Sequence, residues 1–318
     1  MNRSVLWLAL LLAACPSATQ PTGDPDSDTD TDTDSDTDAD SDTDTDTDAD
    51  PDRWEQISAG SDHNCGVRGD GRLTCWGSDG FSVVTGAPSG TFAMTASGHD
   101  FSCALDAAGS ATCWGADDHG QVSDATTIPL SWISAGEWHA CGVALSDGAA
   151  ICWGRDNAGQ STPPSGLASL TTVSAGVKHT CATATGGLVC WGDNDSGEGQ
   201  DRGGSYSAVA AGWQVTCGLR TDKGVDCWGL DNQGQVDGAP SGNSWSGVAL
   251  GRFWTACGVR ENGSVFCWGS DDNGELATQT PDDFRSIAVG NDHACALNRA
   301  GEVHCWGSDA SAQLQVPN

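Results

Sequence analysis

Fourteen of the fifteen cysteines recur in pairs at nearly equal intervals along the chain. Seven of them begin a short segment, with steps of 38, 38, 40, 36, 40 and 38 residues: Cys65, Cys103, Cys141, Cys181, Cys217, Cys257 and Cys295. Each is followed about ten residues later by a cysteine that opens a Cys-Trp-Gly step: Cys75, Cys113, Cys152, Cys190, Cys227, Cys267 and Cys305. Such a fixed period indicates a repeat architecture, in which one unit cannot bury its own faces and must stack on its neighbours.

Each repeat has the pattern of several short strands. Upstream of the first cysteine, large and small residues alternate and end in glycine, as in residues 54–60, which predicts a strand. A second strand holds the first cysteine, a turn follows, and a third strand ends in Cys-Trp-Gly. A fourth, weaker element such as Gly-Gln-Val comes next. Four strands repeated seven times predict an all-β, seven-bladed β-propeller over residues 53–318.

The two cysteines of each repeat are expected to form a disulfide across a hairpin. If Cys65 faces Cys75, then Arg68 faces Arg72 and a standard three-residue loop centred on Asp70 remains. Opposed residues of an antiparallel pair lie about 4.5–5.5 Å apart at Cα, within reach of a disulfide. Zinc sites usually show CxxC knuckles, and the sequence has none. We therefore predict seven disulfides, one in each blade, and an oxidising compartment.

The first residues have the features of an export signal. A charged start is followed by an apolar run over residues 5–14, which is too short to span a bilayer permanently. Leu12-Ala13-Ala14-Cys15 resembles a bacterial lipobox, which implies a signal peptide over 1–14 and lipid on Cys15. An ordinary secretory signal with an incidental cysteine is the alternative. Pro16 favours the outer membrane, so we expect a lipid-anchored protein of the bacterial cell envelope, attached through that lipid alone.

Residues 15–52 are expected to form a disordered tether. From Asp24 to Asp52 every second residue is Asp, and no residue larger than Ala, Ser, Thr or Pro lies between them. Such a segment has nothing to bury, and its charges extend it. Calcium binding is the alternative, but calcium loops need a Gly turn and a terminal bidentate acid, and this run has neither. With 13 basic and 44 acidic residues, the chain should repel nucleic acid.

The repeat resembles that of the regulator of chromosome condensation (RCC1) family. The resemblance rests on Ala175-Gly176, His179, Cys181 and residues 189–192, Val-Cys-Trp-Gly, and on the matching positions of the other units. It implies a seven-bladed propeller, whose ring in that family is often closed by strands from both termini. The founding member exchanges nucleotide on a nuclear GTPase and touches chromatin. Other members are a plant ultraviolet-B photoreceptor and a secreted bacterial inhibitor of β-lactamase. An exported, acidic chain meets neither GTP nor chromatin, so we do not expect the founding activity here.

Residues that recur in every unit are expected to be structural, and those that vary within the constant frame are the candidates for binding. The Cys-Trp-Gly tryptophans belong to the first group, and so do the histidines two residues before the first cysteine: His63, His139, His179 and His293. Other units have Phe101, Val215 or Thr255 there. The second group lies between the first and second strands, in equivalent loops that should ring one end of the channel.

Those loops carry large aromatics that the frame does not require, together with an acid and an arginine. The candidate binding residues are Glu137, Trp138, Trp213, Arg252, Phe253 and Trp254. Exposed aromatics beside an arginine are typical of interface anchors and of sugar-stacking platforms. The alternative is that these side chains pack on neighbouring loops and fill the mouth of the channel.

The sequence therefore predicts a membrane-tethered, non-enzymatic module that binds an extracytoplasmic protein. A carbohydrate-binding surface lipoprotein is the alternative, and an enzyme is a more distant one. No nucleophile motif, phosphate loop or metal-ligand helix is present, so we predict no catalytic residue, cofactor or metal site. The Asp- and Asn-rich steps after Trp-Gly are interpreted as turns first and as calcium sites only remotely.

Overall fold

The computed structural model describes residues 50–277 and 283–317. The predicted signal peptide, Cys15 and residues 15–49 of the tether lie outside the described residues. Apart from one 3-10 turn, η1 (Gly80–Ser82), all regular elements of the described chain are strands. Within that part of the chain, no helix is long and apolar enough to cross a membrane.

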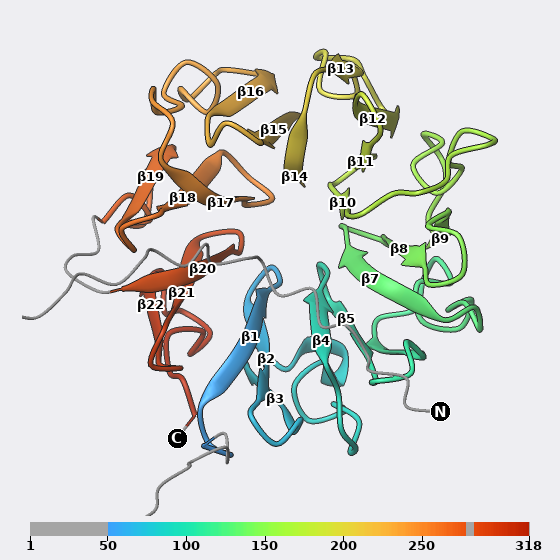
Figure 1. Ribbon diagram of the computed structural model, residues 1–318. Coiled ribbons are helices and arrows are strands. Elements are labelled where there is room, and N and C mark those ends of the chain that lie inside the picture. The colour runs from blue at the N-terminus through green and yellow to red at the C-terminus, as the bar shows by residue number, and fades with distance from the viewer. Residues whose placement is uncertain (1–49, 278–282, 318) are drawn as a thin grey trace, which may run out of the picture. The chain divides into compact units, whose positions relative to one another are not determined.

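The strands form seven antiparallel sheets, each built from consecutive strands, which confirms the seven predicted blades (Figure 1). We number the blades in chain order. Their strands are β1 (Trp54–Ala59), β2 (His63–Arg68) and β3 (Leu73–Gly77); β4 (Met94–Ser97), β5 (Phe101–Leu105) and β6 (Ala111–Gly115); β7 (Leu130–Ala135), β8 (His139–Ala144) and β9 (Ala150–Gly154); β10 (Val173–Ala175), β11 (His179–Ala184), β12 (Gly187–Gly192) and β13 (Arg202–Gly203); β14 (Tyr206–Ala211), β15 (Val215–Arg220) and β16 (Val225–Gly229); β17 (Trp245–Leu250), β18 (Thr255–Arg260) and β19 (Val265–Gly269); and β20 (Phe284–Val289), β21 (His293–Asn298) and β22 (Val303–Gly307).

The predicted fourth strand is wrong for six of the seven blades. Among the described residues only blade 4 has one, where the two-residue strand β13 pairs with β12. In all seven blades the segment after the third strand includes a loop whose backbone carbonyl faces the next blade. The indole Nε1 of each Cys-Trp-Gly tryptophan donates to that carbonyl, as Trp191 does to Gln160 at 2.9 Å and Trp228 to Glu198 at 3.1 Å. That loop satisfies a neighbour's buried N–H and does not extend its own ladder.

The predicted hairpin register is confirmed throughout. Cys65 faces Cys75, and the turn leaves Arg68 N donating to Arg72 O at 2.9 Å. All seven cysteine pairs face each other as cross-strand partners and form disulfides, with Cα atoms 4.0–4.1 Å apart. Seven such bonds indicate an oxidising, extracytoplasmic environment.

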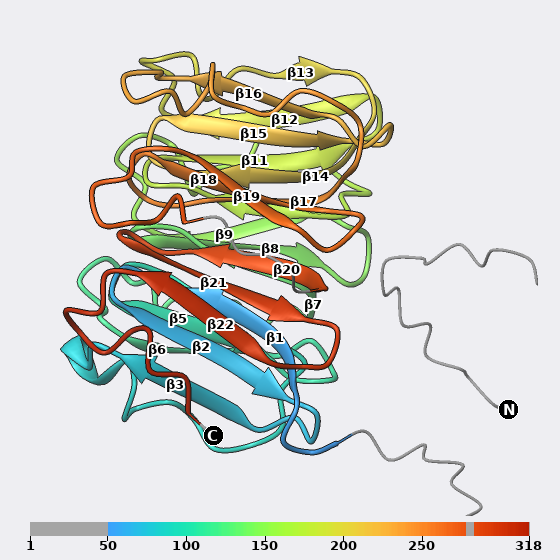
Figure 2. The same ribbon diagram turned by 90° about the vertical axis from the view of Figure 1, so that its left-hand side faces the viewer.

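The first strand of each blade lines the central channel, and the blades follow one another round the ring in phase with the sequence repeat (Figure 1). Within the described residues, no blade combines strands from both termini, although such closure is frequent in the family that the repeat resembles. The ring is closed instead by the segment after β22, which passes beside blade 1 (Figure 2). Its Gln313 carbonyl accepts from Trp76 Nε1 at 3.1 Å and from Asn64 Nδ2 at 2.9 Å.

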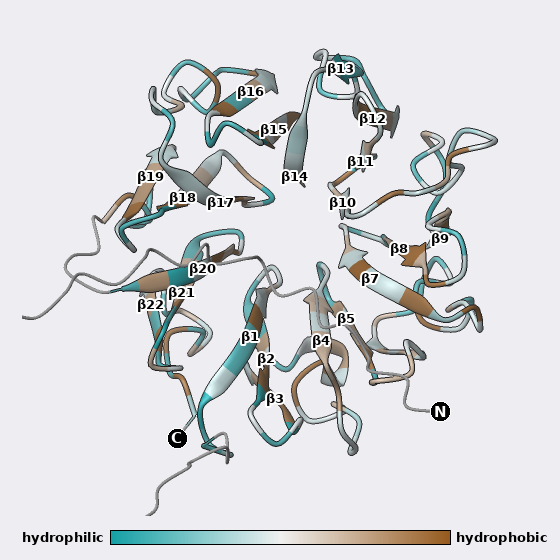
Figure 3. Cartoon of the chain, viewed as in Figure 1, coloured by the Kyte–Doolittle hydropathy of each residue, from teal (hydrophilic) through white to brown (hydrophobic). Residues whose placement is uncertain are grey.

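The hydrophobic core is divided into seven clusters, one at each contact between neighbouring blades. Between blades 1 and 2, for example, Cys65 and Cys75 pack with Ala104 and Trp114. Between blades 5 and 6, Cys217 packs with Ala256 and Trp268. Figure 3 shows hydrophobic residues on parts of strands such as β7, β8 and β19, and hydrophilic residues on many of the connecting loops. Each disulfide therefore braces a hairpin whose faces are buried by its neighbours.

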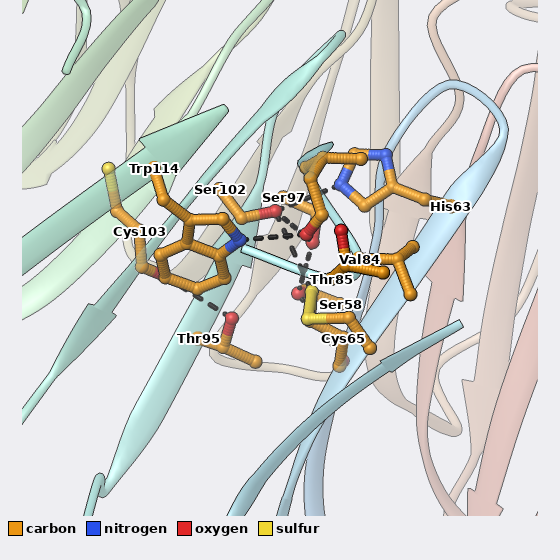
Figure 4. Close-up of a disulfide and its surroundings, with 12 residues drawn as sticks. Ser58, His63, Cys65, Val84, Thr85, Thr95, Ser97, Ser102, Cys103 and Trp114 are labelled. Atoms are coloured by element: carbon orange, nitrogen blue, oxygen red, sulfur yellow. Dashed lines mark hydrogen bonds between the residues drawn. A yellow bond between two sulfur atoms is a disulfide. The ribbon is translucent and has the colours of Figure 1, made fainter. Parts of the chain in front are cut away.

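The four recurrent histidines are structural, and each joins its blade to the next. His63 Nε2 lies 2.9 Å from Ser102 Oγ across the boundary between blades 1 and 2 (Figure 4). His139 contacts Thr180 at 2.9 Å, and His179 contacts Thr216 at 2.8 Å. His293 likewise lies 2.9 Å from Asn64 Oδ1, which links blade 7 to blade 1. All four rings are at most 1% exposed.

At the other three blade boundaries, both the histidine and the oxygen-bearing side chain opposite it in the next blade are replaced. Where Phe101, Val215 or Thr255 replaces the histidine, the residue opposite in the next blade is alanine in each case: Ala140, Ala256 and Ala294. A buried imidazole thus occurs only where the next blade offers an oxygen to it, as expected for polar groups away from water. The pattern explains why the histidine is absent from three units.

Candidate functional site

The loops between the first and second strands of the blades lie at one end of the channel, and the frame fixes their backbone. In all seven blades, the N–H of the residue after Cys-Trp-Gly donates to the carbonyl of the loop residue that precedes the second strand, at 2.7–3.0 Å. Those loop residues are Asp62, Asp100, Trp138, Lys178, Gln214, Trp254 and Asp292. One rigid scaffold therefore presents four kinds of side chain at seven equivalent positions. We call this end of the propeller the loop face.

A ring of glycines keeps the channel narrow beneath the loop face. A Cβ on Gly251 would lie 2.5 Å from the carbonyl oxygen of Gly290, and one on Gly212 would lie 2.9 Å from that of Gly251. The glycine that ends each first strand is thus required by the close approach of the next blade. The cavity enclosed there has a volume of about 50 Å³. Small-molecule sites usually measure about 300–1,000 Å³, so this cavity is much smaller than an ordinary ligand pocket.

Three of the predicted aromatics form one cluster on blades 5 and 6. Trp213 lies 5.3 Å from Trp254 and 6.2 Å from Phe253, measured between ring centroids, and Phe253 lies 5.9 Å from Trp254. The interplanar angles are 45°, 83° and 40° in the same order. Phe253 is 42% exposed, and both tryptophans are half-buried. We call these three residues the aromatic cluster.

The fourth predicted aromatic, Trp138, stands apart from that cluster. Its ring stacks on His99 at 4.8 Å and meets His119 edge-on at 5.6 Å. Its neighbours therefore come from blade 2 and the connection that follows it. The sequence placed Trp138 with Trp213 and Trp254 because all three lie in equivalent loops, but the ring separates blade 3 from blades 5 and 6.

Arg252 lies between the two groups and reaches across the channel. Its Nη2 donates to the carbonyl oxygen of Gly136, in blade 3, at 2.9 Å, while Nη1 is buried without a partner. Burial lowers the pKa of the guanidinium to about 10, and the carboxylates of Glu137 and Asp100 act against that shift. The extra residue in the sixth unit thus supplies a cationic link from blade 6 to blade 3. Of the candidate residues, Arg252 is therefore the one whose side chain fills the mouth of the channel, as in the alternative interpretation of these loops.

Acids occupy the loop face in the three blades that follow the aromatic cluster round the ring. Asp292, Asp62 and Asp100 hold the same loop position in blades 7, 1 and 2. We call these three residues the acidic arc. Burial raises the pKa of both Asp62 and Asp292, with Asp62 adding to the shift of Asp292. A hydrogen bond from His99 at 2.6 Å lowers the pKa of Asp100.

Sequence reasoning passed over the acidic arc because single aspartates in loops are ordinary. The signal that could have found it is the alignment of the loops, which places three acids side by side in consecutive blades.

In the Asp-rich steps after Trp-Gly, carboxylates accept hydrogen bonds from backbone N–H groups of the same loop. Asp117 Oδ1 accepts from Val122 N at 2.9 Å and from Ser123 N at 3.0 Å, and Asp231 has the equivalent bonds in blade 5. Within the described residues, no group of three or more His, Cys, Asp or Glu side chains could hold a metal ion. These acids act as turn caps, which disfavours the calcium alternative.

The comparisons with known proteins agree with this architecture. The model of the regulator of chromosome condensation (RCC1) repeat matches five segments, at residues 54–82, 170–198, 206–235, 245–275 and 284–313. The chain is an RCC1-repeat protein. The five segments coincide with blades 1, 4, 5, 6 and 7, and blades 2 and 3 have the same strand order and disulfide without a match.

Solved structures with the same fold come from plants and yeast. The CRINKLY WD40 ectodomain of the receptor kinase ACR4 from Arabidopsis thaliana is 24% identical, with a TM-score of 0.64 over 80% of this chain and 97% of that one. The ectodomain of the receptor kinase CR4 from Physcomitrella patens is 24% identical, with a TM-score of 0.69 over 80% and 74%. Prp20p from Saccharomyces cerevisiae is 14% identical, with a TM-score of 0.64 over 75% and 80%. No curated protein sequence matches the chain.

Proposed function

We propose that this protein is a lipid-tethered, non-enzymatic module of the bacterial cell envelope that binds a protein partner through its loop face. The observation that carries the proposal is the aromatic cluster of Trp213, Phe253 and Trp254. Three large apolar rings stand partly exposed on loops whose backbone is fixed in every blade. Aromatic anchors on a rigid support lose little conformational entropy on binding and commonly dominate interface energies.

The geometry of the cluster favours a protein over a glycan as the ligand. Sugar-stacking platforms offer one open ring face, whereas these rings pack on one another at 40–83° and share their faces. The channel mouth, at about 50 Å³, supplies no pocket for a sugar ring either. A carbohydrate ligand remains the second candidate function, supported by the half-exposed ring of Trp138 and tested by the same variants.

One solved structure with this fold, that of Prp20p, belongs to a protein that binds partners. The yeast structure is described by its binding properties to Gsp1p and histones. That description concerns Prp20p, and at 14% identity the likeness supports the fold alone. The partner of this chain is therefore inferred from its own loop face.

The test is affinity capture from envelope and secreted extracts with the oxidised full chain as bait. A Trp213→Ala/Trp254→Ala variant and a Trp138→Ala variant separate the two aromatic groups. Leu145→Ala is the matched control, since Leu145 is 60% exposed and lies in the β8–β9 turn at the opposite end of the propeller. We expect a protein retained by the wild type, Trp138→Ala and Leu145→Ala baits and lost from the double variant. Equal capture by all four baits would contradict the proposal, and a glycan in place of a protein would establish the second candidate.

The lipid anchor needs its own test, because Cys15 and the tether of residues 15–52 rest on the sequence pattern. Metabolic labelling with an alkynyl fatty acid should mark the wild-type chain and leave Cys15→Ser unlabelled. Label retained by Cys15→Ser would place the lipid elsewhere, and an unlabelled wild type would indicate a secreted protein with an ordinary signal.

A further inference from the structure

Two of the three acids in the acidic arc, Asp62 and Asp292, are held in surroundings that disfavour their charged form. Asp292 and Asp62 belong to neighbouring blades. The backbone carbonyl of each accepts a hydrogen bond from the N–H of the residue that follows Cys-Trp-Gly in the same blade. Burial raises the pKa of both carboxyl groups, and the nearby acids add to it: Asp100 at Asp62, and Glu275 and Asp62 at Asp292. Half-buried like charges without partners destabilise a fold, and such local conflicts commonly mark functional sites.

Two further acceptors lie unused at the same blade boundary. Ser61 is only 1% exposed, and its hydroxyl oxygen has no hydrogen-bond partner in the described chain. The Oδ1 atom of Asn291 is also buried without a partner. The two residues are directly joined, since Asn291 N donates to the Ser61 carbonyl oxygen at 3.2 Å, and they precede Asp62 and Asp292 in the chain. Buried polar atoms are normally paired, so their orphaned state is a second sign of a ligand.

The chemistry of the site selects a donor-rich cation. Two carboxylates, a hydroxyl and an amide oxygen offer acceptors and few donors. Only two of these four groups are carboxylates, and no group of three or more His, Cys, Asp or Glu side chains gathers in the residues that the structure describes. An ammonium or guanidinium group carries three to five N–H donors and matches the set.

The rest of the loop face fixes how such a cation would be presented. Arg252 reaches across the channel and would repel a second cation there. A cationic group of the ligand would therefore be confined to the loops of blades 7, 1 and 2. The aromatic cluster lies beyond Arg252 on blades 5 and 6 and requires an apolar contact. The face thus has an anionic part and an apolar part, divided by one buried positive charge.

We propose that the partner is a protein that places a lysine or arginine side chain on the acidic arc, between Asp62 and Asp292, and an apolar side chain on the aromatic cluster. This proposal rests on the proposed function and names the chemistry of its partner. The Ser61 and Asn291 oxygens complete the cation site. The positive charge of the partner's side chain offsets the repulsion between the Asp62 and Asp292 carboxylates.

The probe for this test is a phage-displayed library of random dodecapeptides, selected on the oxidised full chain. Parallel selections use Asp62→Asn/Asp292→Asn, Trp213→Ala/Trp254→Ala and the control Asp237→Asn. Asp237 is an exposed acid in the connection between β16 and β17, so this control removes a charge outside the seven loops that carry the site residues. Individual enriched peptides are then measured by fluorescence anisotropy at low and high salt.

The expected result is enrichment of lysine or arginine beside aromatic or aliphatic residues on the wild type and on Asp237→Asn. On Asp62→Asn/Asp292→Asn, affinity for those peptides should fall by about tenfold or more, and the salt dependence should weaken. Peptides that depend on Trp213 and Trp254 but show no basic residue would overturn this inference while the proposed function stands. Peptides indifferent to every variant, or none at all, would overturn both.

A stability measurement keeps the inference testable without a ligand. Asp62→Asn/Asp292→Asn should unfold at the same or a higher denaturant concentration than the wild type, because repulsion is removed. A clear loss of stability would mean that these carboxylates serve the fold, and it would contradict the cation site.

Discussion

Acid should unfold this propeller through the four histidines that join its blades. Thr180 Oγ1 donates to the Gln160 carbonyl at 2.9 Å, so His139 must donate to Thr180 through a protonated Nε2. Nδ1 of that ring is then the unprotonated nitrogen, and it is buried without a partner. A second proton on the imidazole would find no acceptor. The folded state therefore holds His139 neutral.

The size of the effect follows from the pKa values. Burial lowers the pKa of His63 and His139 to about 3 and that of His179 and His293 to about 4. In the unfolded chain the value is about 6.5, so each imidazole gains its proton only on unfolding as the pH falls below that value. Between pH 7 and pH 5 each histidine should remove about 2 kcal/mol of stability, or about 8 kcal/mol for four. Domains typically have about 5–15 kcal/mol in total.

The assay is denaturant unfolding of the oxidised protein, followed by tryptophan fluorescence at a series of pH values from 7.5 to 4.5. The matched variant is His139→Phe/Thr180→Ala, which copies the Phe101–Ala140 pair that the chain itself uses between blades 2 and 3. It should fold at pH 7 and lose about a quarter of the pH slope between 6 and 5, because one of four titrating groups is gone. A midpoint independent of pH, or equal slopes for both proteins, would refute the assignment.

Three other changes probe the frame of the loop face. Gly251→Ala should destabilise the ring by about 1–3 kcal/mol, since the added methyl meets the next blade's glycine carbonyl; an unchanged thermal midpoint would show that the glycine ring can widen. Replacing Cys181 and Cys190 by alanine removes a disulfide between residues nine positions apart. The free energy of unfolding, measured with denaturant, should fall by about 2–3 kcal/mol because the unfolded chain gains conformational freedom, and an unchanged value would contradict this role of the disulfide. Arg252→Met removes one charge-assisted hydrogen bond and a buried charge together, so melting should change by no more than about 2 kcal/mol, and a larger loss would make this residue a main support of the ring.

The repeat pattern was sufficient to predict the blades, because local features determine them. The ten-residue step from Cys65 to Cys75 sets the hairpin register, and the turn at Asp70 follows from it. The fourth strand was mispredicted because a Gly-Gln-Val segment looks like a strand by composition. Its real constraint is a carbonyl that must reach the next blade's indole, as from Gln160 to Trp191, and this contact is not visible in one repeat.

The candidate site was only partly predictable for the same reason. Equivalent loops identified Trp138, Trp213 and Trp254, but the grouping of these residues depends on the order of blades round a ring. Trp213 and Trp254 belong to adjacent blades and meet, whereas Trp138 stacks on His99. The path of Arg252 to blade 3 crosses 116 residues of sequence, which no local pattern encodes.

The central claim is that the loop face contacts a protein in the cell, and in-cell photocrosslinking tests it most directly. Lys178 is exposed at the loop position of blade 4, beside the aromatic cluster of blade 5, and Lys178→p-benzoylphenylalanine would place the probe there. Leu145→p-benzoylphenylalanine would place the same group on the opposite end. The account predicts a discrete protein adduct from position 178, absent at position 145 and lost when Trp213→Ala and Trp254→Ala are added. An adduct from position 145 with none from position 178 would contradict it.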